Sequence, residues 1–168
     1  MTSEVSLVSK KENELLDNVE VALLNMEGAI PIDFPLKHSF IPGYYCRQIF
    51  MPAGSKLTSQ IHRTEHTYHI IQGKLIVWNK GEAVEITAPH CGITTPGTRR
   101  YLEIIEDCIW TTFHPFPQLT GDENNYTDEE KMELVTEIEK LLAEQRINPL
   151  ICQTYRELKE HQKKISHA

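Results

Sequence analysis

Short β-rich runs alternate with turn residues through the middle of the chain, between residues 44 and 114. The breaks between them mostly contain the glycine, proline, asparagine and aspartate residues that favour tight turns. About eight such runs can be distinguished, each too short for a typical helix. They are YYCRQIFM, KLTSQIH, TYHII, KLIVWN, EAVEIT, GITT, RRYLEII and CIWTTFH. This rhythm predicts a mainly β fold, in which antiparallel strands form a sandwich or barrel.

The N-terminal flank has a different pattern. Residues 10–25 predict a short helix, because apolar side chains fall near helical spacing at Leu15, Leu16, Val19 and Leu23. The stretch GAIPIDFPLKHSFIPG then contains three prolines. Proline lacks an amide donor and restricts the residue before it, so we expect this stretch to be extended or looped.

The C-terminal flank predicts two helices. Thr127 and Glu130 form a capping-box pattern, and an apolar stripe follows over residues 132–142. A second helix is expected to start at Asn148, with Pro149 in its first position and a stripe of Ile151, Tyr155 and Leu158. The fold class that we predict is therefore a mainly β, antiparallel barrel with a C-terminal pair of α-helices.

Three regions follow from these patterns: an N-terminal arm over 1–37, a barrel over 38–118 and a helical extension over 119–168. The chain has 168 residues and a formal charge of −7, which argues against direct nucleic-acid binding or binding to anionic membranes. Both flanks carry −4, which leaves +1 for the barrel region. The barrel region could therefore accept an anionic ligand.

Neither a secretory signal nor a membrane span is expected. The stretch MTSEVSLVSKKENELL has no apolar segment after a basic start, and no run is long enough to cross a membrane. The four cysteines form no CxxC pair. We expect an intracellular, cytoplasmic protein with reduced cysteines.

The stretch QIHRTEHTYHIIQGK carries three histidines within eight residues. Alternate residues of a strand share a face, so Gln60 and His62 should point the same way. A hairpin turn at RTE would bring His66 back beside His62, whereas His69 has the opposite parity to His66 and should face outward. His114 ends the last run on the same face as Trp110 and is a candidate third ligand.

Two interpretations of these histidines stay open. Imidazoles on neighbouring strands suit a divalent transition metal, and zinc, iron, manganese and nickel are not distinguishable. Histidines also occupy half-buried strand positions, where they bind carbonyl groups or water. The candidate metal ligands are His62, His66 and His114.

The stretch from MPAGSKLTSQIH to RRYLEIIED resembles a cupin. Gly54 and Gly73 match the glycines of the first cupin motif, and Gly97 matches that of the second. The resemblance places Gln60, His62 and His66 at the His, His and Glu positions of the first motif, and Arg100 at the histidine of the second. Gln60 and Arg100 thus depart from the cupin ligand set.

A narrower resemblance covers residues 38–115. The segments HSFIPGYYCRQIFMPAG, IHRTEH, APHC, PGTRR and EDCIWTTFHP are similar to those of small single-domain cupin-like proteins encoded by tailed phages. This resemblance implies a cupin barrel, a viral origin and a place in the host cytoplasm. It implies no defined activity.

Arginine side chains near the predicted site could hold a phosphate or carboxylate. Arg47 lies in the first long run, and Arg99 and Arg100 follow the PG turn. The alternative for each is a solvated edge or a salt bridge to Glu103, Glu106 or Asp107. The candidate ligand-contacting residues are Arg47, Gln60, Tyr68, Arg100 and Trp110, although tryptophan on such a strand also suits the core.

Three functions of different classes are compatible with these features. The first is a module that binds a small, possibly anionic, ligand such as a nucleotide signal, with or without a divalent metal. The second is a metal-dependent hydrolase, isomerase or dioxygenase. The third is a structural or assembly protein of a virion. The apolar stripe of the C-terminal helices needs a partner surface, so we expect these helices to pack on the barrel or on a second subunit. The resemblance to cupins, which often pair, implies a homodimer.

Overall fold

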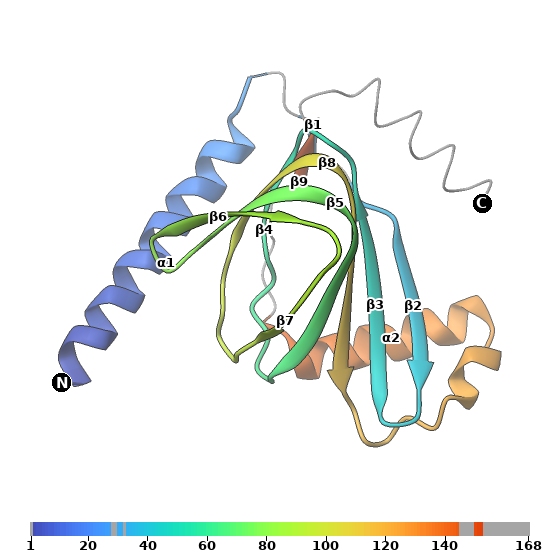
Figure 1. The fold of residues 1–168 in the computed structure, drawn as a ribbon. Helices are drawn as coiled ribbons and strands as arrows, with labels where there is room; N and C mark the ends of the chain where they lie inside the picture. Colours follow the sequence, from blue (N-terminus) through green and yellow to red (C-terminus); the bar gives the residue numbers. More distant parts are fainter. Residues whose placement is uncertain (1, 28–29, 32, 145–149, 153–168) are drawn as a thin grey trace.

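The computed structural model describes residues 2–27, 30–31, 33–144 and 150–152. The chain forms one antiparallel sheet with helices beside it (Figure 1). In chain order the elements are α1 (Thr2–Leu24), β1 (Ile30–Pro31), β2 (Leu36–Ile41), β3 (Tyr44–Met51), β4 (Ser55–Thr58), β5 (His66–Asn79), β6 (Glu82–Thr87), β7 (His90–Thr94), β8 (Tyr101–Pro115), η1 (Asp122–Asn125), α2 (Asp128–Leu142) and β9 (Leu150–Cys152).

Strand β8 organises the sheet. It pairs with β3 and β4 along one edge and with β5 along the other, and every pairing among the described strands is antiparallel. The path β1-β9-β4-β8-β3-β2 curves round so that the strands enclose an inner face (Figure 1). The predicted mainly β, antiparallel barrel fold is confirmed by this pairing.

Two predicted breaks are absent. The runs TYHII and KLIVWN belong to one strand, β5, and the runs RRYLEII and CIWTTFH belong mostly to β8. The pairing of β5 with β8 shifts register around Gly73, which has a φ of 107°. A Cβ atom there would lie 2.6 Å from the carbonyl oxygen of Asp107. Gly73 therefore marks a bulge inside a continuous strand, because both a bulge and a turn favour glycine at positive φ.

The predicted hairpin between the runs KLTSQIH and TYHII is wrong. Strand β4 ends at Thr58, and it pairs with β8 and β9 and not with β5. Backbone bonds hold the segment that follows: the Ser59 amide donates to the Arg100 carbonyl at 2.8 Å, and the Gly97 amide donates to the His62 carbonyl at 2.9 Å. The segment thus crosses between strands without joining a ladder.

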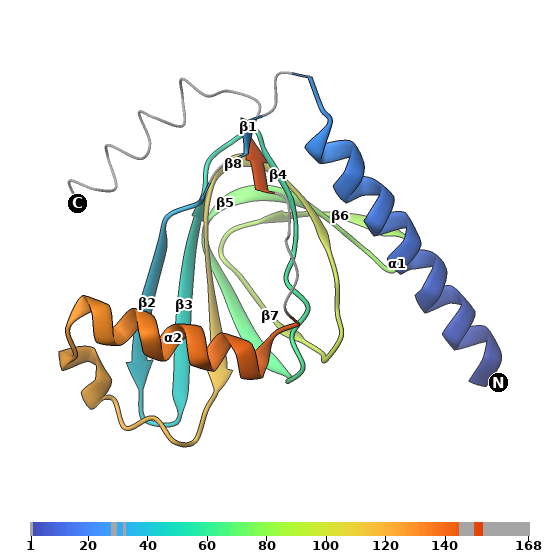
Figure 2. The same ribbon diagram turned by 180° about the vertical axis from the view of Figure 1, so that it is seen from behind.

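Helix α1 is longer than the predicted 10–25 segment and lies on the opposite side of the sheet from α2 (Figures 1 and 2). Leu16 and Leu23 of this helix are buried. The buried guanidinium group of Arg99 lies 2.8 Å from carboxylate oxygens of Asp17 and Glu20 on this helix. Arg99 therefore joins α1 to the sheet, and its partners are not the three acidic residues considered from the sequence.

Within the described residues, two helices, η1 and α2, follow the barrel. The predicted capping box of α2 is present, since the Thr127 side chain accepts from the Glu130 amide and the Glu130 side chain accepts from the Thr127 amide. The second helical stripe that we expected does not begin at Ile151, because this residue is buried in strand β9. Its later members, Tyr155 and Leu158, lie outside the described residues. No helix in the described part of the chain is long and apolar enough to cross a membrane.

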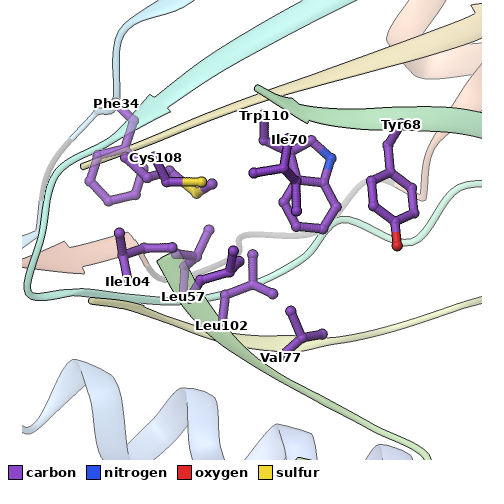
Figure 3. Close-up of a cluster of buried hydrophobic side chains, with 11 residues drawn as sticks. Phe34, Leu57, Tyr68, Ile70, Val77, Leu102, Ile104, Cys108 and Trp110 are labelled. Carbon is purple, nitrogen blue, oxygen red and sulfur yellow. The ribbon is translucent and has the colours of Figure 1, made fainter. Parts of the chain in front are cut away.

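Two apolar clusters stabilise the fold. The larger fills the barrel interior, where side chains from β3, β4, β5 and β8 converge (Figure 3). The smaller lies between the sheet and α2, which crosses β2 and β3 (Figure 2), and consists of Phe40, Tyr45, Leu119, Val135, Ile138 and Leu142. Helix α2 is thereby fixed against one end of the barrel interior.

Candidate functional site

A cavity of about 210 Å³ opens on the inner face of the sheet, next to the larger apolar cluster. One part of its wall is apolar and is formed by Ile49, Met51, Leu57, Leu102 and Trp110. The other part is polar and includes Arg47, Gln60, His62, His66, Thr94 and Arg100. Among the described residues that line the cavity, none is an aspartate or a glutamate. The cavity therefore combines an apolar wall with two guanidinium groups.

Three histidines gather at the polar end of the cavity. The ring centroids of His62 and His66 lie 4.7 Å apart, and those of His62 and His114 lie 4.6 Å apart. His66 and His114 are closer still, at 4.3 Å. His62 and His66 line the cavity, whereas His114 is buried directly behind them, with 1% of its surface exposed.

Each ring is placed by a different element. His66 is the first residue of β5, and its Nδ1 lies 3.2 Å from the Thr64 carbonyl oxygen. His114 lies on β8 opposite Tyr45, and its Nε2 lies 2.9 Å from the Thr112 hydroxyl oxygen. The Nδ1 atom of His114 is buried and has no hydrogen-bond partner among the described residues. The cluster thus contains one unsatisfied polar atom, which is costly in a protein interior.

The end of α2 positions His62. The Arg63 amide donates to the Leu142 carbonyl at 2.7 Å, and the Glu144 amide donates to the Ile61 carbonyl at 2.9 Å. These two bonds form an antiparallel bridge that pairs His62 with Ala143. The C-terminal helix therefore contributes directly to the shape of the cavity.

Burial keeps the histidines neutral. The pKa of His62 is lowered to about 3, mainly by burial and to a smaller extent by the neighbouring His66, Arg47 and Arg100. Burial also lowers the pKa of His114 to about 2, with smaller contributions from His66 and His62. The pKa of His66 is lowered for the same main reason. At neutral pH these rings can donate or accept hydrogen bonds, but they add no positive charge.

The two arginines of the cavity differ in their partners. Arg47 Nη1 donates to Gln60 Oε1 at 3.4 Å, and Arg47 Nε lies 3.3 Å from a carboxylate oxygen of Glu139 on α2. Arg100 instead donates to the Thr94 hydroxyl at 3.1 Å, and its Cζ lies 5.5 Å from the centroid of the Tyr68 ring.

Arg100 differs from Arg47 in having no anionic partner in the described part of the chain. Within the described residues, no carboxylate lies at ion-pairing distance from its guanidinium group. Burial lowers its pKa, although an arginine remains charged at neutral pH. A desolvated cation without a counter-ion lowers stability and is a typical feature of an anion-binding site.

The structure brings most of the sequence-derived site residues together. Arg47, Gln60, His62, His66, Arg100 and Trp110 all line the cavity. Tyr68 lies one layer behind, with its ring 4.7 Å from that of Trp110. His69, expected on the other face, is exposed.

Sequence reasoning missed Glu139 and Thr94. Glu139 lies on a helix whose register against the barrel is set by packing, and no local spacing indicates its partner. Thr94 could have been found from β7, because its position opposite His66 follows once the two strands are paired.

The histidine cluster does not have the arrangement of a metal centre. Among the described residues, no group of three or more His, Cys, Asp or Glu side chains is placed to hold a metal ion. The rings contact one another, and two arginines lie nearby. The positive charge of these arginines opposes the binding of a divalent cation and attracts an anion.

No protein-family model matches the sequence, and no curated protein matches it. Among solved structures, a cupin-2 domain containing protein from Shewanella frigidimarina is similar, with a TM-score of 0.42 and 10% identity over 51% of this chain and 84% of that one. Ectoine synthase from P. lautus matches with a TM-score of 0.45 and 16% identity, over 63% and 80% of the two chains. KdgF from Halomonas sp. matches with a TM-score of 0.42 and 16% identity, over 50% and 86%. The fold class itself rests on the strand pairing described above.

Proposed function

We propose that the cavity binds a small anionic ligand. A carboxylate or phosphate group would lie between Arg100 and Arg47, and an apolar part would lie against Trp110 and its aliphatic neighbours. The observation that carries this proposal is Arg100, a charged group in a largely apolar cavity, beside which the described residues place no carboxylate. Gln60 and the neutral histidines would supply directional hydrogen bonds.

The size of the cavity narrows the ligand class. Sites for drug-sized molecules usually enclose about 300–1,000 Å³, and this one encloses about 210 Å³. A small organic acid fits this volume better than the nucleotide signal considered from the sequence. An origin in a tailed phage and a role in the host cytoplasm, both suggested by the sequence resemblance, are part of the same proposal.

Calorimetric titration with a panel of small carboxylates, phosphate and a mononucleotide tests this function. We expect at least one small acid to bind the wild type, and Arg100→Met to weaken that binding about tenfold or more, because a charged hydrogen bond contributes roughly 1.5–3 kcal/mol. Lys37→Met removes an exposed cation on β2 and serves as the matched control. Equal affinity in Arg100→Met and the wild type would contradict the proposal.

A divalent metal held by His62, His66 and His114 is the second candidate. The unsatisfied Nδ1 of His114 favours it, because a metal ion would satisfy this buried atom. The rings would have to rotate, since their nitrogens do not converge as placed. Elemental analysis of untagged protein tests this: a stoichiometric metal that is lost in His62→Ala and kept in His69→Ala would support it. A metal-dependent enzyme would require the same result.

Homodimer formation is proposed with α2 as the interface. This helix buries Val135, Ile138 and Leu142 against the sheet, yet Met132 and Leu141 stay more than half exposed. Light scattering of the wild type and of a Met132→Lys, Leu141→Lys variant tests it. A monomeric wild type would rule the interface out.

A further inference from the structure

The charge balance around the cavity leaves one positive group uncompensated. Two guanidinium groups line the cavity, and the carboxylate of Glu139 neutralises one of them by its ion pair with Arg47. The ion pair is only partly exposed, with 19% and 29% of the two side chains accessible. Arg100 remains as the cavity cation for which the described residues supply no counter-ion.

Nearby cations on the surrounding elements add no further positive charge that could bind a more anionic ligand. Arg99, the neighbour of Arg100, is bound by Asp17 and Glu20 of α1. Lys56 on β4 pairs with Glu103 on β8 at 3.1 Å. These cations are compensated within the fold, so they are not available to a ligand.

Glu139 is fixed in place by several contacts. The Tyr45 hydroxyl donates to its carboxylate at 3.3 Å, and the same hydroxyl lies 2.7 Å from Nδ1 of His38. The neighbouring Ile138 is buried between α2 and the sheet. The backbone bonds between residues 61–63 and the end of α2 hold the helix in register with the cavity. The carboxylate therefore has a defined position beside Arg47, although Glu139 is not itself among the residues that line the cavity.

We infer that Glu139 is a specificity-determining residue, which makes the cavity select singly charged acids over doubly charged phosphate monoesters. This inference rests on the proposed function and adds the charge of the ligand to it. A carboxylate satisfies Arg100 and leaves the Arg47–Glu139 pair intact. A dianion brings a second negative charge close to Glu139, and like charges repel strongly where water is largely excluded.

Benzoate and phenyl phosphate provide a matched pair of probes, because both carry one phenyl ring. Near pH 7.5 benzoate carries one negative charge, while a phosphate monoester, with a second pKa of about 6, carries nearly two. Calorimetric titration would compare the wild type with Glu139→Gln, which keeps the shape of the side chain and removes its charge. Glu137→Gln, an exposed position on the same helix, is the control.

The wild type is expected to bind benzoate more tightly than phenyl phosphate. Glu139→Gln should raise the affinity for phenyl phosphate about tenfold relative to benzoate, which corresponds to about 1.4 kcal/mol. A merely structural role for Glu139 would weaken both probes together and leave their ratio unchanged, and that result would overturn the inference alone. If neither benzoate nor phenyl phosphate bound to the wild type or to either variant, the proposed function would be overturned as well.

Discussion

The inner face of the sheet has two ends of opposite character, built by the same three strands. At one end β3, β5 and β8 contribute Met51, Leu75 and Cys108, each at most 1% exposed, to the apolar cluster (Figure 3). At the other end the same strands contribute Arg47, His66 and His114. Apolar burial stabilises a fold, whereas buried polar and charged groups cost free energy unless they are fully paired. The polar end therefore lowers the stability of the fold, and this cost indicates that its side chains serve a function.

The largest effect is expected at the apolar end. Leu75→Ala should lower the free energy of unfolding by about 2–5 kcal/mol, because it leaves a cavity where packing is complete. Urea unfolding followed by circular dichroism measures this. Ile71→Ala on the same strand is the control, since Ile71 is 56% exposed. Equal losses in the two variants would mean that the interior of β5 is not the core described here.

Acid should destabilise the polar end. The pKa values of His62 and His114 are about 3 and 2 in the folded protein, below the unfolded value of about 6.5. The unfolded chain therefore takes up protons that the folded chain does not, and stability falls as the pH drops below about 6.5, by at most about 1.4 kcal/mol per pH unit for each ring. Urea unfolding between about pH 7 and pH 5 measures the slope, at pH values above the usual carboxylate pKa of about 4.

A His62→Asn, His114→Asn variant is the control for this slope. Asparagine does not titrate, so the dependence of stability on pH should be flatter over the same interval. An unchanged slope in the variant would show that other groups take up the protons.

Arg100→Met should have a small effect on stability, in contrast to its effect on ligand affinity. The substitution removes a desolvated cation and one hydrogen bond to Thr94, and these two changes oppose each other. We expect the free energy of unfolding to change by less than about 1 kcal/mol, or to increase. A loss as large as that of Leu75→Ala would make Arg100 a structural residue.

The smallest effect is expected on the outer face. His69→Ala should change stability by less than about 0.5 kcal/mol, because the side chain is exposed. It should also leave ligand affinity unchanged, as measured by the same titration. A loss of affinity comparable to that of Arg100→Met would mean that the strand faces are exchanged.

Strand rhythm and parity predicted much of this molecule. The runs YYCRQIFM and EAVEIT coincide with β3 and β6. The inward direction of His66 and the outward direction of His69 follow from the two-residue period of a strand. Gln60 and His62 line the cavity as expected, but for a partly wrong reason. The end of α2, and not a hairpin with β5, holds residues 61–63 there.

The remainder depends on contacts between distant segments. A Gln-Gly pair at residues 72–73 has the same local signature in a turn and in a bulge, and only pairing with β8 decides between them. The partner of Arg47 is 92 positions further along the chain, on a helix whose rotation is set by packing. The ion pair of Arg99 with Asp17 of α1 likewise joins residues that are far apart in the sequence. Such pairs leave no periodic trace in a single sequence.

The pairing of β9 with β1 and β4 has a consequence for synthesis of the protein. Ile151 of β9 lies opposite both Pro31 and Lys56, so the sheet cannot be completed until residues 150–152 have left the ribosome. Until then the nascent chain exposes the edge of β4, and unpaired edges favour association with other chains. Ribosome-bound chains stalled before residue 150 should therefore be digested by protease at β4 faster than chains stalled well beyond it.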